Sequence, residues 1–312
     1  MHARERADFS YGLLRVRLAG RPVRARLPRF RQGGQVVDLG IVVFNEYGVK
    51  PAHLALAVEQ RGFESLFYPE HTHIPVATTR ADDSPARGYA GTYDPFVALS
   101  AAAAVTTTLL VGTAVCLITQ RDPIITAKEV ASIDLLSDGR FLFGVGAGWN
   151  REEMRNHQVE PRTRMRYMAE QVHAMRAIWS QDEAEYHGSF INFDPIWSWP
   201  KPIRGGAVPV LVGGNGPGAE ARVLAFGDGW MPQCGYFDTV DDARTRITDL
   251  RHRAADLGRP EPSVTLFGVP HRRELIDQFA DAGVDRCLLA VRETTETAML
   301  DRLDELAHLN RH

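Results

Sequence analysis

The chain has 312 residues, of which 44% are hydrophobic and 24% are charged, and its formal net charge is −3. These values are typical of a globular protein the size of an enzyme. No apolar run approaches the roughly 20 residues that a membrane-spanning helix needs, and the N-terminus lacks the apolar segment of a secretory signal. We therefore expect a cytoplasmic protein with no membrane partner. Cys116, Cys234 and Cys287 are far apart, which argues against a small disulfide framework or a cysteine zinc site.

The first 36 residues differ from the rest of the chain. Residues 1–35 contain nine arginines and two acidic residues, a net charge of +7, which leaves −10 for the remainder. A basic segment is compatible with nucleic-acid binding or organelle targeting, but this one lacks interleaved aromatic residues and a clear amphipathic period. We therefore interpret residues 1–36 as a disordered Arg-rich leader and residues 37–312 as the folded domain. The acidic domain argues against a nucleic-acid partner.

From residue 38 onward, short apolar segments alternate with amphipathic segments of helix length, which predicts β-α units and a parallel sheet. The predicted strands are 39–44, 65–68, 109–115, 141–145, 208–212, 229–232, 264–269 and 286–291. The predicted helices lie near 51–61, 95–105, 124–136, 163–180, 217–226, 240–257, 271–282 and 295–309. Eight such units predict an α/β protein with a (β/α)8 TIM barrel, and a doubly wound open sheet is the alternative. In the fourth helix, core-facing positions are indicated at Met165, Met168, Val172, Met175 and Trp179.

Two connections are longer than neighbouring elements require, which predicts insertions after strands 2 and 4. Residues 70–93 mix proline, aspartate, glycine and threonine and predict an ordered loop or a lid. Residues 182–206 contain several aromatic residues, among them Trp197 and Trp199, and predict a small hairpin packed on the barrel. These aromatic side chains either line a pocket or cover the barrel surface.

Barrel enzymes place their chemistry at the C-terminal ends of the strands, where Glu70 and His71 follow the second strand. A histidine beside a carboxylate can take up or release a proton near neutral pH, so this pair is the candidate acid/base. His71 and His73 also form a His-x-His pair, as in metal-dependent hydrolase barrels. The fifth and sixth strand ends offer Gly-Gly-Asn and Gln-Cys in place of further metal ligands, so we expect no metal. A serine hydrolase is disfavoured because no Gly-x-Ser-x-Gly motif is present.

Two predicted strands end in glycines. Gly144, Gly146 and Gly148 alternate at the end of the fourth strand, and Gly213 and Gly214 follow the fifth, just before a helix. Because glycines weaken a strand, they favour a ligand that approaches the backbone closely, although a tight turn without a ligand also explains them. Backbone N–H groups before a helix form an anion cradle, which suits a cofactor with a phosphate and a planar ring. The spacing is not that of the dinucleotide-binding fingerprint.

Several motifs together resemble one family. They are Pro-Glu-His-Thr-His-Ile-Pro at 69–75, Gly-Arg-Phe at 139–141, Gly-Trp-Asn-Arg-Glu-Glu-Met at 148–154, Trp-Ser-Trp-Pro-Lys-Pro at 197–202, Val-Gly-Gly-Asn-Gly at 212–216 and Asp-Gly-Trp at 228–230. Over residues 37–309 the chain is similar to the bacterial luciferase-like monooxygenase family, in its coenzyme F420-dependent branch. The resemblance implies a (β/α)8 barrel, usually a homodimer, that binds the deazaflavin F420 or FMN at the C-terminal ends of the strands. It implies an oxidoreductase that transfers hydride between F420 and a small organic substrate.

The resemblance also assigns roles to residues of this sequence. Glu70 and His71 match an acidic residue and a histidine near the reactive ring, where the histidine is a candidate proton donor. Ala114, Val115 and Cys116 match the third strand, which implies a non-proline cis peptide bond at Ala114-Val115 or Val115-Cys116 beside the ring. The other cofactor-binding residues that it implies are Gly146, Ala147, Gly148 and Trp149 near the ring and its tail, and Gly213, Gly214, Asn215 and Gln233 near the phosphate.

Two positions depart from the family pattern. F420-dependent sugar-phosphate dehydrogenases carry an acidic glutamate where Trp149 stands, so their substrate is not implied here. FMN-dependent members have Pro-Val-Arg-Gln at the start of the third helix, and here residues 123–126 read Pro-Ile-Ile-Thr, which favours the deazaflavin. The alternatives are an FMN-dependent luciferase-like monooxygenase and a non-catalytic flavin- or deazaflavin-binding protein. Candidates to shape the substrate pocket are Phe44, Asn45, Trp149, Trp197 and Trp199.

Overall fold

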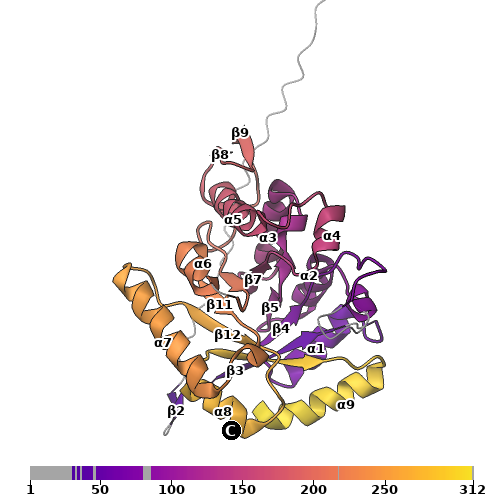
Figure 1. The fold of residues 1–312 in the computed structure, drawn as a ribbon. Coiled ribbons are helices and arrows are strands. Elements are labelled where there is room, and N and C mark those ends of the chain that lie inside the picture. Colours follow the sequence, from indigo (N-terminus) through magenta and orange to yellow (C-terminus); the bar gives the residue numbers. More distant parts are fainter. Residues whose placement is uncertain are drawn as a thin grey trace, which may run out of the picture.

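The computed structural model describes residues 30–31, 34–35, 37–44, 47–79, 86–216 and 218–310. Within these residues, eight parallel strands form a closed barrel with helices around it (Figure 1). The barrel strands are β3 (Asp38–Val43), β4 (Ser65–Tyr68), β5 (Leu110–Thr113), β7 (Phe141–Gly146), β10 (Val210–Gly213), β11 (Gly229–Met231), β12 (Ser263–Phe267) and β13 (Arg286–Val291). β13 pairs with β3, and β10 pairs with both β7 and β11, which closes the ring. The predicted (β/α)8 TIM barrel is therefore confirmed, and the open-sheet alternative is wrong.

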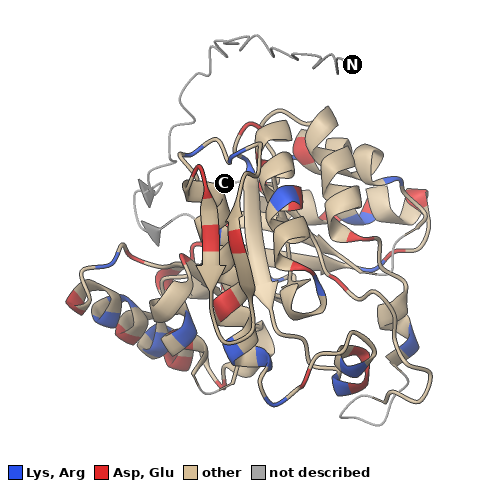
Figure 2. Cartoon of the chain, turned by 90° about the horizontal axis from the view of Figure 1, so that it is seen from above, with Lys and Arg blue, Asp and Glu red and all other residues tan. Residues whose placement is uncertain are grey.

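The predicted helices are present, together with a short helix, α4, that the periodicity does not predict. The helices are α1 (Pro51–Gln60), α2 (Pro95–Val105), α3 (Pro123–Leu136), α4 (Arg151–Asn156), α5 (Arg164–Ser180), α6 (Ala219–Phe226), α7 (Val240–Asp256), α8 (Arg273–Asp281) and α9 (Glu296–Ala307). Short 3-10 turns are η1 (Ala86–Ala90), η2 (Ile118–Gln120), η3 (Cys234–Tyr236) and η4 (His308–Asn310). Charged residues of both signs occur along the outer helices, most visibly on α7 (Figure 2).

Helix caps determine where the loops at the C-terminal face of the barrel end. Side-chain oxygens of the residue before the helix accept hydrogen bonds from amides of the first turn in α2, α3, α4, α7 and α9, at Asp94, Asp122, Asn150, Thr239 and Thr295. Such caps satisfy donors that have no partner inside the helix. The caps thereby fix the starts of α3 and α4 close to the ends of the strands that precede them. Both helix starts lie beside the candidate site.

The core confirms the stripe predicted for α5. Its buried members are Met168, Val172, Met175 and Trp179, and Met165 packs against the core partly buried. The indole N–H of Trp179 donates to the carbonyl of Ala127 in α3 at 2.9 Å. Burial of an aromatic ring with its polar atom satisfied stabilises the contact between these two helices.

The two long connections differ in structure. The one after β4 runs over 69–94 and contains η1. The one after α5 contains an antiparallel hairpin of β8 (Ala184–His187) and β9 (Asn192–Ile196), as the composition predicts. Trp197 and Trp199 follow this hairpin with 74% and 58% of their surface exposed, so neither is enclosed in a pocket. A two-residue strand, β6 (Cys116–Leu117), extends the sheet beside β7.

Part of the chain lies outside the described residues. Of the leader assigned to residues 1–36, the structure describes β1 (Phe30–Arg31) and β2 (Gly34–Gln35), which pair antiparallel. The disorder expected for the leader stays a prediction. Asn45, a candidate pocket residue, also lies outside the described residues. Among the helices that the structure describes, none has the length and apolar character to cross a membrane.

Candidate active site

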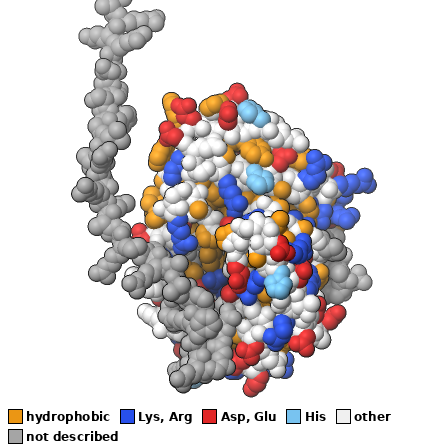
Figure 3. Space-filling view, turned by 90° about the vertical axis from the view of Figure 1, so that its left-hand side faces the viewer, with side chains coloured by type: hydrophobic (Ala, Val, Ile, Leu, Met, Phe, Trp, Pro, Cys, Tyr) orange, Lys and Arg blue, Asp and Glu red, His pale blue; other side chains and the backbone are white. Residues whose placement is uncertain are grey.

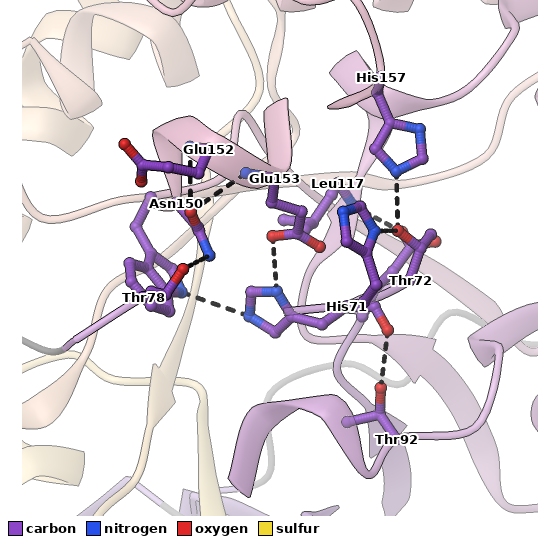
Figure 4. A network of polar contacts seen from close by, with 12 residues as sticks. His71, Thr72, Thr78, Thr92, Leu117, Asn150, Glu152, Glu153 and His157 are labelled. Carbon is purple, nitrogen blue, oxygen red and sulfur yellow. Dashed lines mark hydrogen bonds and ion pairs between the residues drawn. The ribbon is translucent and has the colours of Figure 1, made fainter. Parts of the chain in front are cut away.

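His71 lies at the C-terminal end of the barrel, in the loop after β4. Its Nδ1 is 2.9 Å from Oε2 of Glu153, and the indole Nε1 of Trp149 donates to its Nε2 at 3.3 Å (Figure 4). A carboxylate accepts only, so the proton between them belongs to Nδ1, and the Nε2 lone pair faces Trp149. His71 is therefore held with Nε2 as the atom that can take up a proton.

Glu153, on α4, is a partner of His71 that sequence reasoning missed. Its side chain is fully buried, and its Oε1 has no hydrogen-bond partner in the described part of the chain. Asn150 caps α4 by accepting from the amides of Glu152 and Glu153 at 3.1 and 3.2 Å, and its amide donates to Thr78 at 3.2 Å. The Asn-Arg-Glu-Glu sequence at 150–153 signals such a cap with an acidic first turn.

Glu70, the carboxylate expected to act beside His71, contacts other groups. It accepts hydrogen bonds from the Leu117 amide at 2.7 Å and from Nε of Arg121 at 2.6 Å. Arg121 also pairs with Asp94 at 2.5 Å and with Glu129 at 3.1 Å. These contacts tie the loop after β4 to β6 and α3. The carboxylate that faces the His71 ring is thus Glu153. Glu70 instead anchors the loop after β4 to the Leu117 amide and to Arg121.

The third barrel strand carries a non-proline cis peptide bond between Ala114 and Val115, one of the two positions that the resemblance implies. Val115, which follows this bond, lies against the ends of two other strands. A Cβ atom on Gly146 would lie 2.5 Å from Val115 Cγ2, and one on Gly213 would lie 2.8 Å from Val115 Cγ1. A Cβ on Gly144 would lie 1.9 Å from the carbonyl oxygen of Thr113. These glycines are therefore required by close packing within the protein, and three predicted site residues meet at Val115.

The glycine segment ends at Ala147 and Gly148, beside η2. Gly148 has φ +78°, a left-handed conformation that favours glycine. The hydroxyl of Thr119 donates to the carbonyl of Ala147 at 3.2 Å. Cys116, in β6, is buried, and burial together with the Glu70 carboxylate raises the pKa of its thiol. The segment thus packs against η2, and the neighbouring strand β6 carries an unreactive thiol.

The loop after β10 holds the residues predicted near a phosphate. Gly214 has φ +136°, and its carbonyl accepts from the indole of Trp230 at 3.0 Å. Asn215 and Gln233 bind each other: the Asn215 amide donates to Gln233 Oε1 at 2.9 Å, and the Gln233 backbone amide donates to Asn215 Oδ1 at 2.8 Å. This reciprocal pair shapes the loop by joining the ends of β10 and β11.

Arg222, on α6, is a second residue that sequence reasoning missed. Its guanidinium nitrogens lie 3.4 to 3.6 Å from the Cβ positions of Gly218 and Gly214. Its Nε is buried and, among the described residues, has no acceptor. Burial lowers its pKa, as does the nearby Arg164, because the charge is incompletely compensated. The sequence signal for Arg222 is an arginine one turn inside a helix that follows a glycine loop. An anion at such a helix start would contact both the loop and the arginine.

His73 does not join His71 in a metal site. Its Nε2 is 2.9 Å from the Asn156 amide, and its Nδ1 is 2.9 Å from the Thr72 hydroxyl. The same hydroxyl is 2.7 Å from Nε2 of His157. In the ranges that the structure describes, no group of three or more His, Cys, Asp and Glu side chains is placed to hold a metal ion.

Two aromatic rings lie beside the His71 ring. The Tyr89 ring lies 5.5 Å from His71 and 5.7 Å from Trp149, and the Trp149 ring lies 5.7 Å from His71, all edge to face. Trp149 is 46% exposed. Phe44, another candidate pocket residue, is buried at the end of β3 with its ring against Phe267. The surroundings of Nε2 are therefore apolar and aromatic, which suits a substrate of similar character.

Comparisons with known proteins agree with this architecture. The family model described as "Luciferase-like monooxygenase" matches residues 51–296. An uncharacterized protein of Mycobacterium tuberculosis is 36% identical over 276 residues, 86% of this chain and 96% of that protein. An FMNH(2)-dependent dimethylsulfone monooxygenase of Pseudomonas fluorescens is 32% identical over 136 residues, 43% of this chain and 36% of that protein. A solved F420-dependent secondary alcohol dehydrogenase in complex with an F420-acetone adduct has a TM-score of 0.70 and 18% identity, covering 88% of this chain and 99% of that chain.

Proposed function

Because this chain belongs to the luciferase-like monooxygenase family, we propose that it is a coenzyme F420-dependent oxidoreductase that transfers hydride to or from a small organic substrate. The observation that carries the proposal is the His71–Glu153 pair, which leaves Nε2 facing the indole of Trp149. The names of a structural neighbour that uses F420 and of a relative that uses FMN support a flavin or deazaflavin as the cofactor.

The residues present fit such a cofactor. Arg222 has an unpaired buried Nε beside a glycine loop, and a phosphate there would supply the acceptor that the described residues lack. We assign the backbone of Gly146, Ala147 and Gly148 to the planar ring, with Val115, which packs on Gly146, beside it. We assign Gly213 and Gly214 to the anion site, with Asn215 and Gln233 holding the loop in shape. Ala114 and Cys116 flank Val115 and support its position.

A bound deazaflavin supplies a ring carbon that donates or accepts hydride. When an alcohol is oxidised, His71 Nε2 takes the hydroxyl proton as the hydride leaves carbon, and Glu153 stabilises the imidazolium through Nδ1–H. When a carbonyl, C=N or activated C=C bond is reduced, the same imidazolium returns the proton. Glu70 acts indirectly, because it binds Arg121 and so holds the start of the loop that carries His71. The aromatic rings of Tyr89 and Trp149 exclude water from this proton transfer.

The first turn of α3 supports the choice of F420 over FMN. Asp122 accepts hydrogen bonds from the amides of Ile124 and Ile125 at 2.9 Å each, so a carboxylate already occupies this helix start. A phosphate at this helix start would be repelled, and no arginine stands at residues 123–126 to attract one. An FMN-dependent monooxygenase remains the second candidate because one relative carries that activity in its name.

Parallel fluorescence titrations of the full chain with F420 and FMN test the proposal. We expect micromolar binding of F420 and binding of FMN at least about tenfold weaker. In Arg222→Gln the F420 affinity should fall about tenfold or more, since a charge-assisted hydrogen bond is lost, while Arg253→Gln on the exposed face of α7 leaves it unchanged. Tighter binding of FMN would favour the monooxygenase, and binding of neither would overturn the cofactor assignment.

The proposal includes a homodimer formed through α2 and α3. These adjacent helices expose Val97, Val105, Ile125 and Leu136, and Trp199 lies against α3, where its carbonyl accepts from Lys128. Exposed apolar side chains gathered on neighbouring helices favour association. A second copy fits because α2 has no charged residue and a single polar one, Ser100.

We propose no nucleic-acid or membrane partner, because basic and acidic side chains are interspersed on the face shown in Figure 3. The free thiols suit a cytoplasmic location.

A further inference from the structure

The inside of the barrel holds a hydrophobic cluster of its own. Each of the eight barrel strands contributes a side chain to it, from Val42 in β3 round the ring to Leu288 in β13. Side chains of all eight strands can meet only in the interior of the closed ring. Phe44, which follows β3, belongs to the same cluster, and the partly buried Val115 packs against it. Phe44 and Val115 therefore lie at the C-terminal end of the interior, where the barrel opens.

Arg292, the residue after β13, points over this opening. Along β13 the side chains alternate: Leu288 and Ala290 pack in the interior cluster, whereas Leu289 packs outside the ring. Because successive side chains of an extended strand leave on opposite faces, residue 292 falls on the inward side. A cation–π contact agrees with this direction, since the guanidinium carbon of Arg292 lies 5.0 Å from the centroid of the Phe44 ring. Arg292 thus places a positive charge over the barrel mouth.

No carboxylate of the described residues pairs with the side chain of Arg292. Glu293, its neighbour in the chain, accepts from the Arg292 backbone amide at 2.9 Å and from Nε of Arg302 at 2.8 Å. This carboxylate holds the end of β13 in place and is already bound to another guanidinium. Arg292 is exposed, and its contact with an aromatic ring leaves N–H donors of the guanidinium free to bind an oxyanion.

The order of the strands separates Arg292 from the anion loop that we assign to the cofactor. β13 is followed round the ring by β3 and then β4, and His71 lies in the loop after β4. In the other direction, β12 and β11 stand between β13 and β10, whose loop carries Gly213 and Gly214. The two cations therefore lie over different parts of the mouth: Arg222 beside the glycine loop, and Arg292 on the side that borders the His71 loop.

We propose that Arg292 binds a carboxylate of the substrate and thereby selects an apolar or aromatic acid for hydride transfer. A guanidinium presents two parallel N–H groups to a carboxylate, and its single charge balances this monoanion. The Phe44 ring receives the apolar part next to the carboxylate, and His71 serves the reacting carbon. The inference rests on the proposed function for the role of His71. Binding of an acid at Arg292 does not depend on which cofactor is present.

Ligand-observed NMR on the full chain, with and without F420, tests this site with benzoate and benzamide, two probes of nearly equal shape. We expect saturation transfer to benzoate and at least about tenfold weaker binding of benzamide. Arg292→Gln should weaken benzoate binding about tenfold or more, because charge-assisted hydrogen bonds are lost, and leave benzamide binding unchanged. Arg292→Lys should give an intermediate affinity, since it keeps the charge without the paired N–H groups. The control Arg253→Gln, on the exposed face of α7, should change neither probe.

Two further titrations identify which anion Arg292 binds. The Kd of Arg292→Gln for F420 should equal that of the unmodified chain, and Arg222→Gln should bind benzoate as the unmodified chain does. A loss of F420 affinity in Arg292→Gln with benzoate binding retained would assign Arg292 to the cofactor and overturn the proposal. Equal binding of benzoate and benzamide, or an unchanged benzoate affinity in Arg292→Gln, would overturn it as well.

The failure of this inference is distinguishable from the failure of the proposed function. Benzoate binding that is measured without cofactor and lost in Arg292→Gln supports the acid site even where F420 does not bind. Because the Arg292 side chain is exposed, its replacement should leave the Tm unchanged, so that a lost benzoate signal reports binding and not unfolding.

Discussion

Glu153 controls what His71 can do. Its buried carboxylate binds Nδ1 and leaves Nε2 facing Trp149, so the mechanism that we propose assigns one ring nitrogen to orientation and the other to proton transfer. Sequence proximity pointed to Glu70, which stands next to His71 in the chain. In the structure the Glu70 side chain faces β6 and Arg121. Adjacent residues of an extended loop point to opposite sides, whereas α4 brings Glu153 to the ring from 82 residues away.

A substitution that keeps the shape of Glu153 and removes its charge tests the His71–Glu153 pair. Glu153→Gln should lower kcat about hundredfold with the Kd for F420 unchanged, because a neutral amide stabilises the imidazolium poorly. His71→Ala should lose at least as much. Turnover is followed by the absorbance of F420 with an alcohol or carbonyl substrate found by screening.

The neighbouring Glu152→Gln serves as the control, since Glu152 is 58% exposed and pairs with Arg155. Unchanged turnover in Glu153→Gln would remove Glu153 from the mechanism. Loss of F420 binding in the same variant would instead mean that Glu153 supports the cofactor site.

At the scale of the element, α4 is a short helix whose position depends on Asn150, the residue that caps its N-terminus. Asn150 is buried, caps two amides and reaches Thr78 in the connection after β4. The helix is only six residues long, too short to be stable alone. Its cap therefore holds Glu153 against His71 and joins the connection after β4 to the barrel.

Removing this cap should affect both stability and activity. Asn150→Ala is expected to cost about 1 kcal/mol of unfolding free energy and to lower turnover, because Glu153 loses its fixed position. Thr239→Ala, which removes the cap of α7 on the outside of the barrel, should cost a similar amount and leave turnover unchanged. Denaturant unfolding and F420 turnover measure the two effects. Equal turnover in both variants would refute the positioning role of α4.

For the whole molecule, the exposed apolar face of α2 and α3 bears on assembly. We expect a dimer in sedimentation velocity at micromolar concentration. Ile125→Glu should convert it to a monomer, because a charge would be buried against apolar side chains. Leu257→Glu, at the end of α7, replaces a side chain that is 62% exposed and should leave the dimer intact. A monomeric unmodified chain would contradict the proposed interface.

Much of this architecture follows from local patterns in the chain. Alternating apolar strands and amphipathic helices predicted every barrel strand and its following helix, because burial of one face imposes a periodicity that sequence displays directly. The ends that moved did so by one or two residues, as in β5, where the predicted strand 109–115 ends at Thr113. A cis bond between Ala114 and Val115 follows it, and Val115 lies between Gly146 and Gly213.

The sequence by itself determined the barrel, the family and the end of the barrel that carries the site, because these depend on periodicity and on motifs read within short segments. Only the tertiary structure decided which side chains meet. His71 with Glu153, and Val115 with Gly146 and Gly213, are contacts between segments far apart in the chain. Such contacts depend on closure of the barrel and on the direction in which each side chain leaves its backbone, and no local pattern encodes that geometry.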